Sequence, residues 1–532
     1  MGLNLHEDSY STCTSSIKTS SLKTGQSFND NQKITKAVII AAGNGSRLEG
    51  YQNGCPKPLV KVGGMPLLQR VILSAKRIGI TELVIVLGYQ AARIRKTINS
   101  RKLGVKITWV RNLDWRKPNG VSVLKAEKFV EGRFLLFMSD HIFNANILEK
   151  LKKVQIGEEC GLLCVDYALA TVQNLDDATK VRTVDNQLID LGKNLTDFNA
   201  IDVGIFMQTP LIFDALRRSQ AQGDYSLSGG VRVLAEAGRM CTFNIGDSFW
   251  QDVDTIPDIR YAERLLLRAT RSPRDGIVAK RLNRGVSNRI SKWLIKTPIT
   301  PNQISIFNLL LMGFAAWLIS FGKPLNTIIG GILFQLTSIL DGCDGEVAQI
   351  KLKDSKFGAF IDTLTDQISY IIFIIGGTIG AYNATNDTIV FWVAGFSLAL
   401  IAVALRFSLL YIKKKGSVSL KDFDQDISSF THPGQQPWYL KFFGVIHQLG
   451  RRDAWSFAGF LVMLGGSITV FFWVLMAVLN MLGIGIIITA GTLLSQRHGV
   501  NAFNPIKKLY HQVIRWFSST EIELQPENEL TK

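Results

Sequence analysis

The sequence predicts two domains of different classes, an α/β doubly wound domain followed by an all-α membrane domain of six helices. With 532 residues the chain is too long for one ordinary domain. Short apolar runs alternate with helical patterns from Lys36 to Leu267, as in a doubly wound fold. From about residue 304 onward the apolar runs instead reach the roughly 20 residues that a helix needs to cross a bilayer.

The first domain is expected to centre on buried parallel strands. Continuous apolar runs without polar alternation are typical of strands that are covered on both faces. We expect such strands at residues 37–43, 82–88, 106–110 and 133–140. The amphipathic segment 67–79 is then the helix that crosses from the first of these strands to the second.

The second domain is expected to hold six membrane-spanning helices, with both termini of the chain in the cytoplasm. Apolar segments occur at residues 304–322, 325–341, 361–382, 388–411, 455–472 and 473–495. The loops between them are alternately basic and nearly free of Lys and Arg, and basic loops stay on the cytoplasmic side. We therefore expect an integral protein of the cell inner membrane.

The net charge of +17 indicates the kind of partner that the chain contacts. Much of the positive charge flanks the apolar segments, where it would meet anionic lipid headgroups. No basic motif with interleaved aromatic residues, as in nucleic-acid readers, is present, so we expect membrane lipids and no nucleic acid. The expected borders are a disordered polar leader at 1–35, the first domain at 36–267, a basic juxtamembrane linker at 268–300, the membrane domain at 301–515 and a polar tail at 516–532.

Four aspartates lie near the cytoplasmic edge of the predicted membrane domain: Asp341, Asp344, Asp362 and Asp366. A charged side chain at the bilayer centre costs about 2.5–3.5 kcal/mol on insertion scales, so these acids need cations or water. Spacings of three and four residues place each pair on a single helix face. Carboxylate oxygens suit Mg²⁺ and Mn²⁺, so we predict a divalent metal site. The alternative is a cytoplasmic loop of solvated acids paired with nearby lysines.

The full spacing around these acids, D-x2-D-G-x2-A-x9-G-x3-D-x3-D, resembles the signature of the CDP-alcohol phosphotransferases, an integral-membrane family of six helices. The resemblance implies that Asp341, Asp344 and Asp362 hold metal against the pyrophosphate of a CDP-alcohol. Asp366 would contact metal and take a proton from the acceptor hydroxyl, and CMP would leave. Gln349 stands where the family usually has arginine. The small residues expected to let the nucleotide approach the backbone are Gly345, Ala348 and Gly358.

A glycine-rich turn, AAGNGSRL, follows the first predicted strand of the first domain. Backbone N–H groups in such a turn can approach phosphate, and Arg47 and Lys57 can neutralise its charge. The turn is not a Walker loop, because it lacks the G-K-[ST] sequence. Ala42, Gly43 and Gly45 are the expected nucleotide contacts.

Together with PKPL at residues 56–59, this turn resembles the sugar-phosphate nucleotidylyltransferase family, and the similarity extends over about residues 36–267. The resemblance implies that a phosphate monoester attacks an NTP and releases pyrophosphate, with Lys57 and Arg47 offsetting charge in the transition state. Asp140 would bind Mg²⁺. The second metal ligand is Asp252 or Asp254, which the sequence does not separate.

Further residues are implied by the same resemblance. Asn119, Gly120 and Ser122 would lie against the base. Lys193 would bind the phosphate of the acceptor, with Asp202 nearby, although a solvated surface lysine is the alternative. His141 is expected to be structural and not a base.

The order of the two halves resembles the bifunctional CTP:inositol-1-phosphate cytidylyltransferase and di-myo-inositol-phosphate-phosphate synthase group. The resemblance implies that CTP and inositol 1-phosphate, or a similar polyol phosphate, give a CDP-alcohol that the membrane domain consumes. Arg451 and Arg452 would bind the acceptor phosphate, both active sites would face the cytoplasm, and a homodimer through the membrane helices is expected. The alternatives are a lipid acceptor with a different or inactive first domain, an inactive nucleotide-binding regulator and a transporter.

Overall fold

The computed structural model describes residues 34–48, 51, 54–154, 156–157, 159–271, 276, 278–415 and 452–498. The chain divides into two compact units. The described residues up to Arg271 form the first unit together with Lys292–Pro298 and Glu346–Asp354, and the other described residues form the second unit. The predicted leader at 1–35 and tail at 516–532 fall almost wholly outside the described residues.

The first unit is built on a nine-stranded mixed sheet in the order β5-β4-β1-β6-β11-β8-β12-β10-β9. The strands of this sheet and of two small ribbons are β1 Lys36–Ala41, β2 Lys61–Val62, β3 Met65–Pro66, β4 Glu82–Leu87, β5 Lys106–Arg111, β6 Phe134–Met138, β7 His141–Phe143, β8 Gly161–Asp166, β9 Lys180–Val184, β10 Gln187–Gly192, β11 Ala200–Gln208, β12 Met240–Asn244 and β13 Trp250–Asp252. Strands β5, β4, β1 and β6 run parallel, and β11 joins them antiparallel.

The four strands predicted from apolar runs are all present and parallel, which confirms the doubly wound arrangement of this part. Helix α2, Leu67–Arg77, crosses from β1 to β4 as predicted. The prediction that 106–110 is buried is wrong, because β5 is an edge strand whose residues are only partly covered. Position in the sheet order, and not the residues of β5, decides its exposure.

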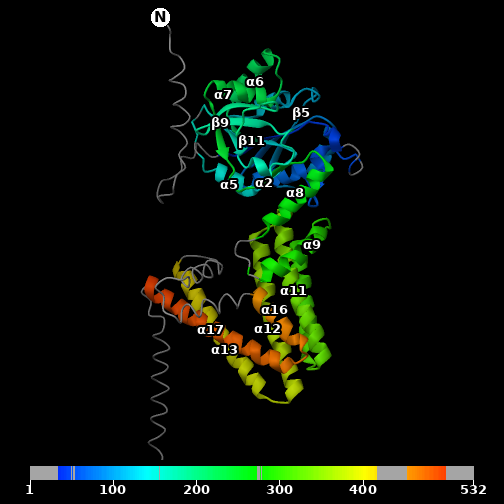
Figure 1. Ribbon diagram of the computed structural model, residues 1–532, viewed down its shortest axis with the longest axis vertical. Coiled ribbons are helices and arrows are strands. Elements are labelled where there is room, and N and C mark those ends of the chain that lie inside the picture. Colours follow the sequence, from blue (N-terminus) through cyan, green and yellow to red (C-terminus); the bar gives the residue numbers. More distant parts are fainter. Residues whose placement is uncertain are drawn as a thin grey trace, which may run out of the picture. The chain divides into compact units, whose positions relative to one another are not determined.

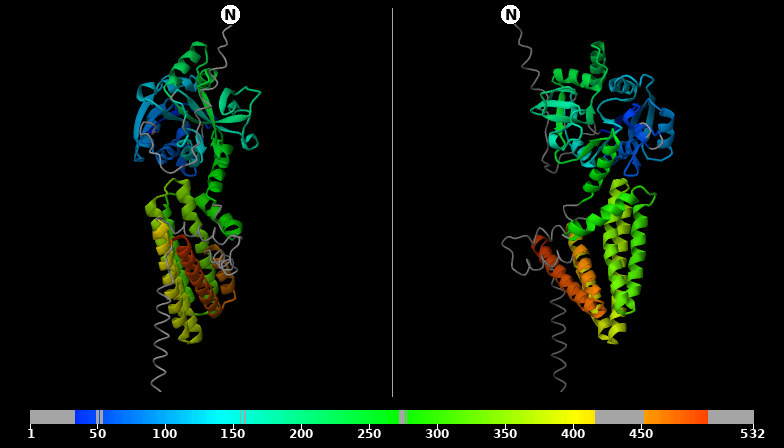
Figure 2. Two further views of the ribbon diagram at one scale, coloured as in Figure 1. Left: turned by 90° about the vertical axis from the view of Figure 1, so that its left-hand side faces the viewer. Right: turned by 45° about the vertical axis from the view of Figure 1, so that its right-hand side comes forward.

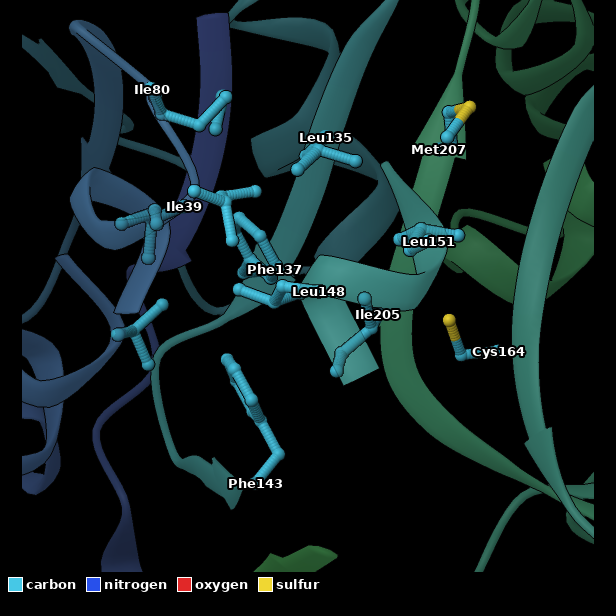
Figure 3. Close-up of a cluster of buried hydrophobic side chains, with 14 of the residues drawn as sticks. Ile39, Ile80, Leu135, Phe137, Phe143, Leu148, Leu151, Cys164, Ile205 and Met207 are labelled. Atoms are coloured by element: carbon cyan, nitrogen blue, oxygen red, sulfur yellow. The ribbon is translucent and has the colours of Figure 1, made fainter. Parts of the chain in front are cut away.

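Helices cover both faces of the sheet and create two hydrophobic cores. Their bounds are α3 Ala91–Asn99, α4 Asn119–Leu124, α5 Ala145–Leu151, α6 Leu211–Ala221, α7 Leu227–Glu236 and α8 Ile256–Ala269. Ile39 of β1 faces the core with α2 and α5, whereas Val38 faces the core with α6 and α7, since side chains alternate along a strand (Figure 1). Figure 3 shows the first core, where Phe137, Leu148 and Ile205 meet from a strand, a helix and a second strand.

The second unit is helical. Its long helices are α10 Pro301–Ser320, α11 Pro324–Ile350, α12 Lys356–Thr385, α13 Ile389–Lys415, α16 Arg452–Leu464 and α17 Ile468–His498, and the π-helical turn Ala279–Asn283 and α9 Arg284–Leu294 precede them in the chain. Five of these helices are long and apolar enough to cross a membrane. Helix α16 has 13 residues, about 20 Å at 1.5 Å per residue, which is short of the roughly 30 Å hydrocarbon core. Six spans are therefore not confirmed among the described residues.

The predicted boundary between the apolar segments 455–472 and 473–495 is wrong. Helix α16 ends at Leu464 and α17 begins at Ile468, so the break comes several residues earlier than predicted. Gly466 lies in this break with φ of +73°, a backbone conformation that glycine adopts without strain. The apolar run continues through the break, which is why hydropathy alone misplaces it.

Side-chain size and caps fix how the helices of the second unit pack. Thr300 caps α10. Its side chain accepts from the backbone N–H of Gln303, and the Gln303 side chain accepts from the backbone N–H of Thr300. Gly376 and Gly380 of α12 lie so close to α10 that a Cβ would meet backbone oxygens of α10 at 2.5 and 2.3 Å. Helix α17 contacts α12 and α13 and is inclined to α10 and α11 (Figure 2). The close pairing of α10 with α12 positions the polar residues described below.

Candidate active sites

The glycine-rich turn after β1 brings Lys57 close to a group of acids. Gly45 has φ of +62°, and a Cβ there would meet the Cβ of Lys57 at 2.5 Å, so only glycine allows this approach. Pro56 precedes Lys57 with φ of −61°, and Lys57 begins a short 3-10 turn. The Ala42–Gly45 backbone, Arg47 and Lys57 thus gather after the carboxyl end of a parallel strand, where ligands of open α/β sheets bind.

A two-stranded ribbon assembles the acids of the first unit. Asp140 lies between β6 and β7, and β7 pairs antiparallel with β13 so that His141 is directly opposite Asp252. One ligand atom each of Asp140, His141 and Asp252 lies within 4.8 Å of the others, a spacing that could hold a metal ion. The carboxylate oxygens suit a hard divalent cation such as Mg²⁺ or Mn²⁺.

The ammonium group of Lys57 occupies the centre of this acid group. Its Nζ lies 2.6 Å from Asp140 Oδ2 and 3.6 Å from Asp252 Oδ1, and it also donates to Asp254 Oδ1. Burial alone would lower the pKa of Lys57, but the charges of Asp140, Asp252 and Asp254 outweigh burial and raise it. Burial alone would raise the pKa of Asp140, yet Lys57 and His141 lower it, so Asp140 is ionised.

The geometry distinguishes Asp252 from Asp254. Both oxygens of Asp254 accept bonds from cations, Oδ1 from Lys57 and Oδ2 from Arg47 at 3.0 Å. Asp252 Oδ1 is shielded from solvent and accepts no hydrogen bond within the described part of the chain. Burial raises the pKa of Asp252 to about 6, and Asp140 and Asp254 raise it further, because the charges of His141 and Lys57, which lower it, do not offset burial. These features suit Asp252 for binding a metal ion, whereas Asp254 pairs with the side chains of Arg47 and Lys57.

Asp177 is a residue that sequence reasoning missed. Its side chain accepts from Arg47 and, at 2.7 Å, from Lys193 Nζ, so it joins two cations that the sequence assigned to different phosphates. The hydrogen bonds from Arg47 and Lys193 lower the pKa of Asp177 to about 2. Asp177 lies in a loop before β9 without any motif, so no signal in the sequence points to it.

A cavity of about 600 Å³ adjoins this acid group. Its lining includes the predicted residues Asn119, Asp140, Lys193, Asp202, Asp252 and Asp254. Asp202 Oδ1 accepts from the backbone N–H of Gly204 at 2.7 Å, and burial raises the pKa of Asp202 to about 6. The cavity therefore offers both acidic and basic groups to a polar ligand.

The residues predicted to lie against the base form one wall of the first unit. They belong to α4, where Ser122 is buried and accepts from Asn112 Nδ2 at 2.9 Å, and Asn119 Oδ1 accepts from the Leu227 backbone N–H at 2.9 Å. A Cβ at Gly120 would meet the Tyr225 carbonyl oxygen at 2.6 Å, so α4 packs directly on the chain before α7. Gly120 and Ser122 thus shape the wall, while Asn119 lines the cavity.

The second group of acids lies between α11 and α12. Oxygens of Asp341 and Asp344 from α11 and of Asp362 from α12 lie within 4.8 Å of one another. Asp344 is buried, with its side chain 6% exposed, whereas the other two are partly exposed. The helical spacing of three residues places the α11 acids together, as the sequence predicted, and helix packing adds Asp362.

A serine of α10 also belongs to this group, and sequence reasoning missed it. Ser305 is buried and donates from Oγ to Asp344 Oδ2 at 2.5 Å, while the Gly345 backbone N–H donates to Asp344 Oδ1 at 2.6 Å. Both bonds hold the carboxylate in one orientation. Asp366 lies one turn after Asp362 on α12 and is not in the group of three that the described residues form.

The small residues of the signature leave space beside these acids. Among the described residues, no atom outside the adjoining backbone of α11 lies within 4 Å of a Cβ built on Gly345, and Ala348 follows one turn later on α11. Gly358 lies in the first turn of α12, and its backbone N–H donates to the Ser355 side chain at 2.9 Å. Gln349 is exposed and its side chain donates to the Ala269 carbonyl oxygen at 3.4 Å. Arg451 lies outside the described residues, and only the backbone of Arg452, the first residue of α16, is described.

The two halves match two known families. Residues 37–235 match the MobA-like NTP transferase domain, and residues 298–424 match CDP-alcohol phosphatidyltransferase. The second group of acids and Asp140 and His141 of the first lie within these matched regions, and Asp252 lies 17 residues after the end of the first match. The chain is therefore a transferase that joins a nucleotidyltransferase domain to a CDP-alcohol phosphotransferase domain.

Proteins that carry the name bifunctional IPC transferase and DIPP synthase are similar to this chain. The protein from Archaeoglobus fulgidus is 35% identical over 345 residues, which are 64% of this chain and 65% of that protein. Those from Rubrobacter xylanophilus and Thermococcus kodakarensis are 33% and 34% identical, covering 77% and 79% of their lengths. The chain belongs to this family. Among solved structures, an inositol-1-phosphate CTP transferase from T. maritima aligns with 44% of this chain and 96% of that chain, at 22% identity and a TM-score of 0.40.

Proposed function

We propose that this protein makes a CDP-alcohol in its first domain and consumes it in its membrane domain. The first reaction transfers a cytidylyl group from CTP to inositol 1-phosphate, or a similar polyol phosphate, and releases pyrophosphate. The second transfers the phospho-alcohol to the hydroxyl of an acceptor, a second inositol phosphate, and releases CMP. The observation that carries this proposal is the presence of two separate carboxylate groups, each with metal-binding spacing and each in its own transferase domain.

In the first reaction the chain's residues bind and orient charged groups. Asp140 and Asp252 would hold the metal ion, which neutralises charge on the triphosphate when bound. Lys57 and Arg47 would then turn from the acids to the phosphates, offsetting the charge that develops at the α-phosphorus. Lys193 would bind the phosphate of the polyol, and Asp202 would accept hydrogen bonds from its hydroxyl groups. The glycine turn and the α4 wall would hold the triphosphate and the base.

In the second reaction the membrane acids take corresponding roles. Asp341, Asp344 and Asp362 would hold the metal ion that neutralises the donor pyrophosphate. Asp366 would accept the proton of the attacking hydroxyl and contact metal during the reaction. The open space at Gly345, with Ala348 and Gly358 nearby, would admit the nucleotide. Arg451 and Arg452 would bind the acceptor phosphate.

The arrangement in the membrane is also part of the proposal. Five helices have the length and composition of spans, and the shorter apolar helix α16 would be part of the sixth. Six spans and the alternation of basic loops would place both termini and both sites on the cytoplasmic side of the cell inner membrane. The expected dimer would form through the membrane helices.

Membranes that contain the full-length protein, incubated with radiolabelled CTP, inositol 1-phosphate and Mg²⁺, test the proposal. We expect release of pyrophosphate, a transient CDP-inositol, then CMP and a water-soluble phosphodiester. Asp252→Asn should stop pyrophosphate release but leave CMP release from added CDP-inositol, and Asp344→Asn should let CDP-inositol accumulate. A product that partitions into chloroform would instead identify a lipid acceptor. No pyrophosphate release with CTP or any other NTP, over a panel of polyol phosphates, would refute the cytidylyltransferase.

A further inference from the structure

His141 lies between groups that hold its imidazole ring in one position. The β7–β13 ribbon places it directly opposite Asp252, and its ring stacks on Trp250 with centroids 6.0 Å apart and an interplanar angle of 11°. Trp250 is diagonal to His141 across the ribbon, where aromatic side chains reach each other. Trp250 is itself held, because its Nε1–H donates to Asp166 Oδ2 at 2.8 Å and Asp166 is buried.

The imidazole ring also lies close to Gly204 of β11. A Cβ at Gly204 would come within 2.7 Å of His141 Nε2 and 2.8 Å of its Cδ2. Gly204 has φ of +73° in the part of β11 where its register with β8 shifts between Asp202 and Phe206. The Asp202 side chain accepts from the Gly204 N–H at 2.7 Å, which stabilises this irregular backbone. The ring therefore fits a space that a larger residue at 204 would fill.

With the ring held in this way, Nδ1 is directed at Asp140. The distance from His141 Nδ1 to Asp140 Oδ1 is 2.9 Å, against 4.0 Å to Asp252 Oδ1. An ionised carboxylate only accepts, so Nδ1 carries the hydrogen. Asp140 Oδ2 accepts from the ammonium group of Lys57, which occupies the cation position, so Oδ1 contacts His141 and Oδ2 faces the place that a metal ion would take.

We propose that His141 is a positioning residue, whose Nδ1–H fixes the Asp140 carboxylate in the orientation that metal binding requires. The proposal rests on the metal role of Asp140 in the function proposed above. Groups that orient a ligand without touching the metal change metal affinity by about 10- to 100-fold when they are removed. His141 was expected to be structural. A positioning role differs from a structural one because it predicts that substituting His141 changes the metal affinity while the stability stays unchanged.

Two substitutions separate these roles. Asparagine can place a side-chain N–H close to the position of Nδ1, so His141→Asn retains the donor. His141→Leu has a similar volume and can pack on Trp250, but it cannot donate. Binding of Mn²⁺ would be measured by electron paramagnetic resonance on full-length protein in detergent, without nucleotide. Every sample would carry Asp341→Asn and Asp344→Asn, so that the centre in the first domain is the one titrated.

We expect His141→Leu to weaken Mn²⁺ binding at least about tenfold and His141→Asn to stay within about threefold of the parent. Thermal unfolding confirms that both variants are folded. Equal affinity in all three proteins would refute the proposal and leave His141 structural. Equal loss in both variants, together with nitrogen hyperfine coupling to Mn²⁺ in the parent, would also refute it, because His141 would then be a metal ligand.

The readout is independent of turnover. If the protein released no pyrophosphate but His141→Leu still weakened Mn²⁺ binding selectively, the cytidylyltransferase proposal would fail and the positioning role would stand. If pyrophosphate release were robust and Mn²⁺ affinity were insensitive to both substitutions, the reverse would hold.

Discussion

Replacing Lys57 with methionine tests whether an ammonium group substitutes for a metal ion in the resting first domain. The substitution keeps an unbranched stem and removes the charge between Asp140, Asp252 and Asp254. At an effective dielectric constant of about 20, Coulomb's law gives about 6 kcal/mol for the 2.6 Å pair with Asp140 and about 5 kcal/mol for the 3.6 Å pair with Asp252. Desolvation of the buried lysine offsets much of this attraction, since burial acts against its charge.

The net effect follows from breaking a buried group of charges. Removing one partner of a buried ion pair destabilises by about 3–5 kcal/mol, because the remaining charges have no counterion. At about 2–4 °C per kcal/mol for a domain of this size, the melting temperature should fall by about 6–20 °C in the presence of EDTA. Added Mg²⁺ should restore most of the loss in the variant, since the cation position no longer holds an ammonium group.

The assay is thermal unfolding of the full-length protein in detergent, with EDTA and with Mg²⁺. Lys193→Met is the matched control, because Lys193 is exposed and pairs at 2.7 Å with one exposed carboxylate, an interaction of about 0–1 kcal/mol. Its melting temperature should change little in either buffer. The reasoning is refuted if Lys57→Met has the same melting temperature as the wild type in EDTA, or if Mg²⁺ raises the melting temperature of both proteins by the same amount.

Four further changes have defined outcomes. Ser305→Ala removes the bond to Asp344 and should raise the Mg²⁺ concentration needed for half-maximal CMP release about tenfold, consistent with about 1.5–3 kcal/mol for a charged hydrogen bond; an unchanged requirement would contradict it. Asp344→Asn should reduce CMP release at least about 100-fold without slowing pyrophosphate release, and loss of both would contradict separate sites. Gly45→Ala should cost about 1–2 kcal/mol for its positive φ and raise the KM for CTP, which initial rates over a CTP series would show. The pKa of Asp202 is about 6 in the folded state against 3.8 in the unfolded chain, so the wild-type protein loses stability as pH rises from about 4 through 6. The melting temperature of Asp202→Asn relative to wild type should therefore increase over this window, by the equivalent of up to about 3 kcal/mol. A pH-independent difference in melting temperature would refute this prediction.

Several features of the first domain follow from local sequence, and others do not. The apolar runs of β1, β4 and β6 predict buried strands because period and burial are encoded in neighbouring residues. The partial exposure of β5 depends on its place at the edge of the sheet, which its own residues do not encode. Likewise the end of α16 is hidden within one apolar run, and only the backbone at Gly466 reveals it.

The candidate sites divide in the same way. By itself the sequence determined the residue types and spacing of both acid groups, because Asp341 and Asp344 are three residues apart on one helix and motifs mark Lys57 and Asp140. Tertiary structure alone decided that Asp252 and not Asp254 shares a group of possible metal-ligand spacing with Asp140 and His141, and that Asp177 and Ser305 contact the two sites. The physical reason is that helical spacing acts over a few residues, whereas strand pairing and helix packing join residues that are far apart in the chain. Those contacts depend on the shape of the whole fold and leave no local pattern.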